Sequence, residues 1–185
     1  MKIISGCVKS TKLEWLPVLS HIALPEVHRH SAELKMIEKI QNSPSLPIYD
    51  DFYNAPNKRL KSRNPIWTLK RRIITEGDLW KLHWKDGEVL NNHFISNPTQ
   101  LVPGFVFPRA AWTALNRVRT GQGRCNYLMH KWSMVDSPFC NCGQIQTIRH
   151  IVEKCSETKF SGGTSGLRNG DKEALDWLCN LATRL

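Results

Sequence analysis

The sequence predicts a mainly helical protein with a small module near its C-terminal end that cysteine and histidine side chains hold together. Apolar residues recur at helical spacing in several stretches, and connectors rich in proline and glycine separate these stretches. Three cysteines and one histidine fall within sixteen residues, at Cys140, Cys142, His150 and Cys155. At 185 residues the chain is long enough for one domain or for two small ones.

These four residues form the pattern C-x-C-x7-H-x4-C, which supplies a complete tetrahedral ligand set for one Zn²⁺. Gly143 follows Cys142 and can take a positive φ, which lets the loop turn around an ion. His150 and Cys155 are about 140° apart on an ideal helix, so the helix predicted over 147–155 must loosen or end near Cys155. Four protein ligands leave no coordination position for water, so we expect the Zn²⁺ to be structural.

The alternative interpretation of this pattern is a set of ordinary buried cysteines beside a core histidine. The single residue between Cys140 and Cys142 is tighter than the usual gap of two to four. Cys125 and His130 are minor alternative ligands, since they lie further from the cluster along the chain. Six cysteines without a secretory signal favour reduced thiols over a disulfide scaffold, so we expect a nuclear or cytoplasmic protein that is not secreted.

The charge of the chain favours a polyanionic partner. Lysine and arginine number 26 against 16 acidic residues, which gives a formal charge of +10 and an isoelectric point near 9.5. The alternative is a basic soluble protein with no such partner. There is no run of eighteen apolar residues, so the sequence predicts no spanning helix and no membrane partner.

Sequence patterns in the N-terminal third of the chain predict two helices. A capping box from Thr11 to Glu14 indicates a short helix over 11–20. Pro25 suits a first helical position, and the following helix should extend over 27–40. We expect its buried face to carry Ala32, Met36, Ile37 and Ile40.

Residues 42–57 predict an irregular connector that contains the run Tyr49-Asp50-Asp51. Paired aspartates of this kind occur in polymerases, but no distant third aspartate or strand pair supports that interpretation. We expect a solvated turn.

A basic segment follows in which seven cations occur without an acidic residue. These are Lys58, Arg59, Lys61, Arg63, Lys70, Arg71 and Arg72. Such a segment can neutralise phosphates while Trp67 stacks on a base; the alternative is a solvated face with Trp67 in the core. A helix over 76–86 comes next, and its tryptophans Trp80 and Trp84 are interpreted as core residues rather than a stacking surface.

No carboxylate occurs between Glu88 and Asp136, and this window contains five cations: Arg109, Arg117, Arg119, Arg124 and Lys131. A helix predicted over 108–120 buries the stripe Ala111, Trp112, Leu115 and Val118. Arg109 and Arg117 should project away from this stripe, with Arg119 nearer its edge. We expect these cations to contact a phosphate backbone, although a helix dipole also favours arginines in a last turn.

A final helix is predicted to begin near Asp171 and to pack through its apolar side chains. Its expected core residues are Ala174, Leu175, Trp177, Leu178 and Leu181. It is locally acidic, so we do not expect it to contact nucleic acid.

Several short motifs together resemble one known family. They are EWLPVLS at 14–20, RLKSR at 59–63, PGF at 103–105, LNRVRTGQG at 115–123, CNCG at 140–143, QT at 146–147 and His150-Ile151-Val152. In this order they resemble the C-terminal region, beyond the polymerase thumb, of the reverse-transcriptase polyprotein of non-LTR (LINE-type, jockey-like) retrotransposons.

The resemblance implies a helical segment over 1–57, a basic connector with a short helix over 58–102, and a helical zinc-binding module over 103–185. It implies a fragment that binds template RNA or target DNA beside a reverse-transcriptase core. The polymerase palm, its paired-aspartate box and the endonuclease are missing, and no catalytic constellation is legible, so we expect no enzymatic activity. The alternatives are an adaptor that docks on the polymerase core and a non-functional remnant of a mobile element.

Overall fold

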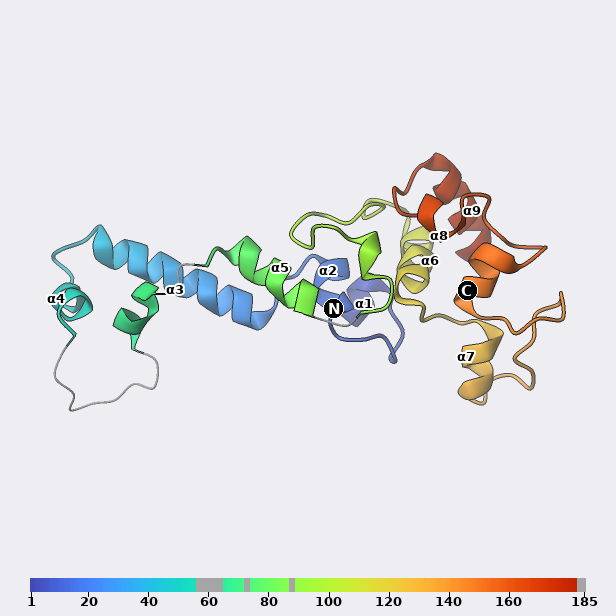
Figure 1. Ribbon diagram of the computed structural model, residues 1–185, viewed down its shortest axis with the longest axis horizontal. Helices are drawn as coiled ribbons and strands as arrows, with labels where there is room; N and C mark the ends of the chain where they lie inside the picture. Colours follow the sequence, from blue (N-terminus) through green and yellow to red (C-terminus); the bar gives the residue numbers. More distant parts are fainter. Residues whose placement is uncertain (56–64, 72–73, 87–88, 183–185) are drawn as a thin grey trace. The chain divides into compact units, whose positions relative to one another are not determined.

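The fold is mainly helical, as predicted from the sequence (Figure 1). The computed structural model describes residues 1–55, 65–71, 74–86 and 89–182. Within these ranges the strand-like pairing consists of one isolated antiparallel bridge between Phe139 and Ile145. None of the helices in these ranges has both the length and the apolar character needed to cross a membrane.

The chain divides into two compact units. The first comprises Met1–Ile22 together with Asp86–Leu185, and the second comprises Ala23–Lys85. This division differs from the expected boundaries at 57 and 102, because the N-terminal residues pack against a helix more than a hundred positions later. Arg109 donates to the carbonyls of Ile3 and Ile4, and Asn116 Nδ2 donates to the Ser5 carbonyl at 2.9 Å.

The second unit is organised by α3 (Pro25–Gln41), which begins at the predicted proline. Its buried residues are Val27, Ile37 and Ile40. Ala32 and Met36, which were predicted to face inward, are exposed. The prediction failed because the partners of α3 cover its two ends rather than one continuous stripe (Figure 1).

One end of α3 is covered by two short helices, α4 (Ile48–Tyr53) and η1 (Ile66–Arg71). Phe52 is fully buried against Ile37 and Ile40, and Trp67 packs on the same cluster. Trp67 is partly buried there, which favours the core interpretation over a base-stacking surface. Asp50 and Asp51 are exposed, as expected, but lie on α4 and not in a turn, because the burial of Phe52 stabilises a helix there.

The other end of α3 packs against α5 (Glu76–Asp86). Trp80 is buried beside Ala23 and Val27, and Trp84 is buried as well, which confirms that both tryptophans are core residues. The Thr75 hydroxyl accepts a hydrogen bond from the Asp78 backbone N–H at 3.1 Å and so caps the first turn.

The first unit begins with α1 (Lys2–Ser5) and α2 (Trp15–Ser20). The predicted capping box at Thr11 is wrong: α2 begins four residues later, with Glu14 at its N-cap and no side-chain capping bond. Thr11 instead belongs to a turn in which its N–H donates to the Val8 carbonyl at 3.1 Å.

The core of the first unit lies between α6 (Arg109–Thr120) and α9 (Lys172–Ala182). Both helices follow their predicted bounds closely. The α6 stripe is buried as predicted, and the buried residues of α9 are Ala174, Leu178 and Leu181. The Asp171 carboxylate accepts from the Ala174 N–H at 2.8 Å and caps α9.

Shorter helices complete the first unit. They are η2 (Asn92–Phe94), α7 (Asn126–Lys131), η3 (His150–Lys154) and α8 (Gly163–Gly166). Gly121 ends α6 in the left-handed conformation, as the sequence predicts for a helix that stops at glycine.

Candidate metal centre

A tight loop carries the first two cysteines of the cluster. The bridge between Phe139 and Ile145 closes this loop, and the Cys140 N–H donates to the Gln144 carbonyl at 2.7 Å. Gly143 has φ +84°, and a Cβ at this position would meet nothing within 4 Å. Positive φ rather than crowding therefore explains the glycine, as the sequence predicted.

The second pair of residues sits at the two ends of η3, a short π-helical turn. The Cys155 N–H donates to the His150 carbonyl at 2.8 Å, a hydrogen bond that spans five residues instead of four. This wider turn brings two side chains that an ideal α-helix would separate onto one side. The expected loosening of the helix is therefore present, and it occurs as a π-turn.

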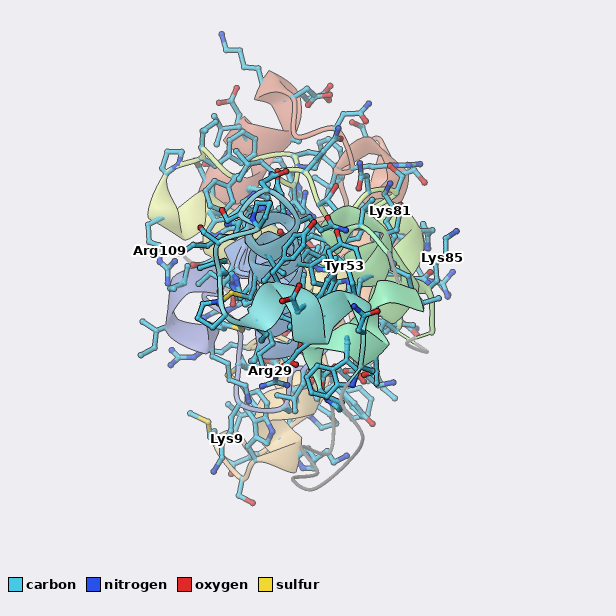
Figure 2. The ribbon with its side chains drawn as sticks, turned by 90° about the vertical axis from the view of Figure 1, so that its left-hand side faces the viewer. Lys9, Arg29, Tyr53, Lys81, Lys85 and Arg109 are labelled. Atoms are coloured by element: carbon cyan, nitrogen blue, oxygen red, sulfur yellow. The ribbon has the colours of Figure 1, made fainter. Side chains whose placement is uncertain are left out.

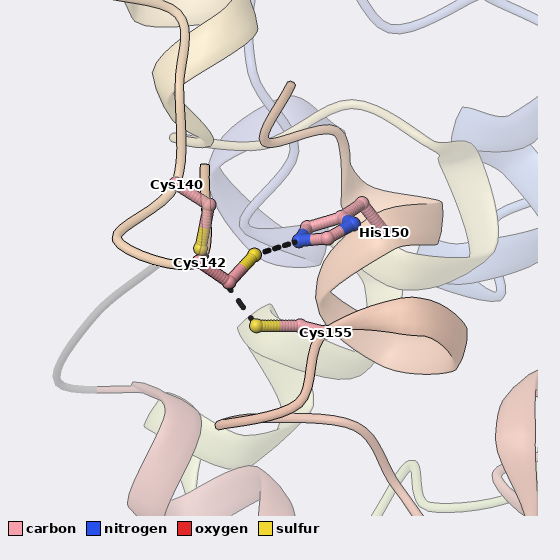
Figure 3. Close-up of side chains that lie close together, drawn as sticks. All are labelled: Cys140, Cys142, His150 and Cys155. Carbon is pink, nitrogen blue, oxygen red and sulfur yellow. Dashed lines mark hydrogen bonds between the residues drawn. The ribbon is translucent and has the colours of Figure 1, made fainter. Parts of the chain in front are cut away.

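The four side chains converge on one point (Figure 3). Their ligand atoms all lie within 4.8 Å of one another. Cys140 Sγ is 3.7 Å from Cys155 Sγ, and Cys142 Sγ is 3.2 Å from His150 Nε2. A tetrahedral Zn²⁺ with Zn–S bonds of about 2.3 Å requires sulfur atoms about 3.8 Å apart, so the arrangement fits such an ion.

The thiols of the cluster differ in acidity. Burial raises the pKa of Cys155, but hydrogen bonds from Thr158 and from the backbone N–H of Glu157 outweigh it and lower the pKa from 9.0 to about 6. For Cys142, a hydrogen bond from the Gln144 backbone lowers the pKa, whereas burial and the two neighbouring thiols raise it by more. Cys155 is therefore a thiolate at neutral pH and a ready metal ligand.

Gln146 links the cluster to α7. From the sequence it was named within the QT motif at 146–147 but was given no role at the cluster. Its side-chain Nε2 lies 3.6 Å from Cys140 Sγ, and its Oε1 accepts from the Asn126 N–H at 2.8 Å. Its backbone carbonyl accepts from the Tyr127 N–H at 3.1 Å. The first turn of α7 is thus held by the residue that supports a metal ligand, a relationship that pairs residues twenty positions apart.

The alternative ligands are not part of this cluster. Cys125 is buried in the apolar core of the first unit, and burial raises the pKa of its thiol. His130 is exposed on α7. Among the described residues, the group that could hold a metal ion comprises Cys140, Cys142, His150 and Cys155. Three thiols and an imidazole are a donor set of the kind that holds a tetrahedral metal ion such as Zn²⁺.

Part of the predicted basic surface lies outside the described residues. This applies to Lys58, Arg59, Lys61, Arg63 and Arg72, and to the side chains of Lys70 and Arg71. Arg109 is described and exposed (Figure 2). Its guanidinium donates to the Ile3 and Ile4 carbonyls of α1.

Arg119 is buried, so the expectation that it contacts a phosphate backbone is wrong. Its side chain is only 1% exposed, and its guanidinium donates to the Pro103 carbonyl at 2.6 Å and to Asn116 Oδ1 at 3.3 Å. The guanidinium carbon lies 5.7 Å from the centre of the Trp112 ring. Burial lowers the pKa of Arg119 to about 9. Arg119 therefore anchors the segment before α6 and is not available to a phosphate.

The other cations remain accessible to different degrees. Arg124 and Lys131 are exposed, and Arg117 is half-buried. All three come from the segment that leads from α6 through α7 to the metal loop.

No protein-family model, curated protein or solved structure matches the chain.

Proposed function

We propose that the chain is a nucleic-acid-binding module whose C-terminal part is held together by a structural Zn²⁺. The observation that carries the proposal is the position of the cysteine–histidine cluster directly after a basic segment without acidic residues. No carboxylate occurs over residues 89–135, and the exposed cations Arg124 and Lys131 lie near the end of this segment. Such cations bind phosphates and release condensed counterions when they do so.

The metal has a structural role in this proposal. Four protein donors complete a tetrahedral site and leave no position for a reacting water, so no catalytic activity is assigned. The ion cross-links the loop at 140–142 to η3, while Gln146 connects this loop to α7. Zn²⁺ binding thereby fixes the helix that ends at Lys131.

The proposal extends to a biological setting through the motifs that resemble a non-LTR retrotransposon. In that setting the nucleic acid is template RNA or target DNA, and the protein partner is the reverse-transcriptase core. Phosphate contacts would supply affinity without reading sequence, since no base-reading set of side chains is evident among the described residues.

The test is a titration of the zinc-loaded full chain against labelled single-stranded RNA, single-stranded DNA and duplex DNA, followed by fluorescence anisotropy. We expect the logarithm of the binding constant to fall linearly with the logarithm of salt concentration. If folded, zinc-loaded protein binds none of the three at low salt, the proposal is wrong and an adaptor that docks on a protein partner becomes the better interpretation.

A further inference from the structure

The first unit contains a pocket of about 610 Å³ beside α6 and α7, outside the metal cluster. Its lining comes from three separate segments: the loop after α1, the C-terminal part of α6 with the following loop, and the turn after α7. The lining residues are Cys7, Val8, Lys9, Ser10, Arg117, Arg124, Trp132 and Met134.

The loop after α1 is fixed in place by close packing. A Cβ on Gly6 would lie 2.3 Å from Thr113 Oγ1, so only glycine allows the chain to pass this close to α6. Lys2 Nζ donates to the Lys9 carbonyl at 2.7 Å, and the Ser10 hydroxyl donates to Gln122 Oε1 at 2.8 Å. The backbone around Lys9 is thereby held next to the loop that follows α6.

The loop after α6 brings two arginines to the same pocket. A Cβ on Gly123 would lie 3.2 Å from the Cβ of Arg117 and 3.0 Å from Ile148. The chain therefore folds back tightly over Arg117, and Arg124 comes next in sequence. Burial lowers the pKa of Arg117 most, and the charge of Arg124 lowers it further, as expected for two guanidiniums that repel each other, while Cys7 acts in the opposite direction.

The charge of the pocket has one sign. Lys9, Arg117 and Arg124 contribute three cations, and no acidic residue is among the described residues that line it. The lining joins the N-terminal loop around Lys9 to the turn after α7. A multiply charged oxyanion would relieve this repulsion, and arginine is well suited to phosphate because its planar group presents parallel donors.

An aromatic side chain accompanies these cations. Trp132 is the C-cap of α7 and half-buried, and its backbone N–H donates to the Leu128 carbonyl at 3.0 Å. Ser133 then turns the chain back with φ +57°, which brings Met134 to the pocket, where it is 61% exposed. The pocket thus offers an indole and a thioether next to its cations, which a simple phosphate site does not require.

We infer that this pocket binds one nucleotide of a single-stranded nucleic acid, with its phosphate at Arg117 and Arg124 and its base against Trp132. The inference rests on the proposed function and deepens it, because it assigns a subsite and a strand state. A paired base in a duplex is stacked on both faces, whereas a base in a single strand can turn onto an aromatic side chain.

The test of the cations compares two exposed residues. Arg124→Ala removes a charge from the pocket, whereas Lys131→Ala removes one from α7 outside it. With zinc-loaded protein and a short single-stranded oligonucleotide, we expect Arg124→Ala to weaken binding at least about tenfold. We expect Lys131→Ala to weaken binding less than about threefold.

The test of the aromatic side chain uses Trp132→Leu, with Tyr127→Leu as the control from an exposed aromatic of α7 outside the pocket. We expect Trp132→Leu to weaken binding about 5- to 150-fold without changing the salt slope, because stacking releases no counterions. Trp132→Phe should retain most of the affinity. Zinc content and thermal unfolding of each variant show whether a loss reflects misfolding.

An oligonucleotide with abasic positions isolates the base itself. Removing bases should weaken binding to the wild-type chain but not to Trp132→Leu, and a duplex should show no dependence on Trp132. Equal effects of Trp132→Leu and Tyr127→Leu would overturn the subsite while leaving general nucleic-acid binding intact. Displacement by a free nucleoside monophosphate at oligonucleotide-like concentrations would overturn the assignment to a strand, and the lack of any strand binding would overturn the proposed function as well.

Discussion

The Cys155 N–H donates to the His150 carbonyl across five residues, at 2.8 Å, and this single hydrogen bond places two candidate metal ligands on one side of η3. A π-turn is less favourable than a regular helical turn and needs compensation from its surroundings. Convergence with Cys140 and Cys142 offers that compensation, because an ion bound to all four residues would hold both ends of the turn.

Removal of the metal should therefore destabilise the first unit. We expect one Zn²⁺ per chain by elemental analysis and a lower melting temperature after treatment with a chelator, restored by added Zn²⁺. Cys142→Ala should abolish stoichiometric binding. Cys179→Ala, at an exposed cysteine of α9 outside the cluster, should retain the full metal content. Equal metal content in both variants would exclude the assigned ligands.

Metal binding should release fewer protons than three protonated thiols would supply. The pKa of Cys155 is lowered to about 6, so this thiol is already ionised at neutral pH, whereas Cys142, with a raised pKa, must lose its proton. The Cys155 thiolate is present above its folded-state pKa and is lost as pH falls through about 6. Calorimetric titrations in buffers of different ionisation enthalpy measure the protons released, which should increase in number when the titration is repeated below that pH.

Gln146 should tune the affinity for the metal without being a ligand. Gln146→Leu removes both the donor to Cys140 Sγ and the acceptor for the Asn126 N–H. We expect metal affinity to fall about 10- to 100-fold, as for other residues that support ligands. Gln144→Ala is the matched control, because Gln144 accepts from Cys140 through its backbone carbonyl, which the substitution retains. Competition with a chromophoric chelator distinguishes the two variants.

Arg119 should matter for stability and not for nucleic-acid binding. Arg119→Ala leaves a cavity and removes the donors to Pro103 and Asn116, so we expect a loss of about 2–4 kcal/mol in the free energy of unfolding. Arg119→Met fills more of the space without a buried charge and should cost less. Chemical denaturation measures both. The salt slope of nucleic-acid binding should remain unchanged in Arg119→Met, in contrast to Arg124→Ala; a reduced slope would show that Arg119 reaches phosphate after all.

Local patterns in the sequence predicted the elements that depend on neighbouring residues. The ligand quartet, the start of α3 at Pro25, the end of α6 at Gly121 and the stripe of α6 all follow from spacing and turn chemistry. The burial of Arg119 was not predictable in this way, because it depends on the Pro103 carbonyl, which reaches α6 from outside the helix. For the same reason the role of Gln146, named from the sequence only as part of a motif, was not predictable, because it depends on Asn126 twenty positions earlier. The pocket was not predictable from local patterns either, because it joins Lys9 to Trp132 across more than a hundred residues.

The contact between Gly6 and Thr113 should control both the stability of the first unit and the shape of the pocket. Gly6 has φ +67°, and an added Cβ would meet Thr113 Oγ1 at 2.3 Å. Gly163 has φ +57° and nothing within 4 Å of an added Cβ. It is therefore the control for the cost of placing a side chain on left-handed backbone without any crowding. We expect Gly163→Ala to cost about 1 kcal/mol in the free energy of unfolding and Gly6→Ala to cost more.

A second substitution separates strain from crowding at this contact. Thr113→Ala removes Oγ1 and the methyl group but keeps the Cβ that lies 2.9 Å from the added atom. The double variant should therefore recover part of the stability lost in Gly6→Ala, by an amount that a double-mutant cycle in urea measures. Because the loop over Lys9 depends on this packing, Gly6→Ala should also weaken single-strand binding more than Gly163→Ala does, with the metal content of both variants unchanged. Equal destabilisation by the two glycine substitutions would show that α1 does not pack on α6 through this contact.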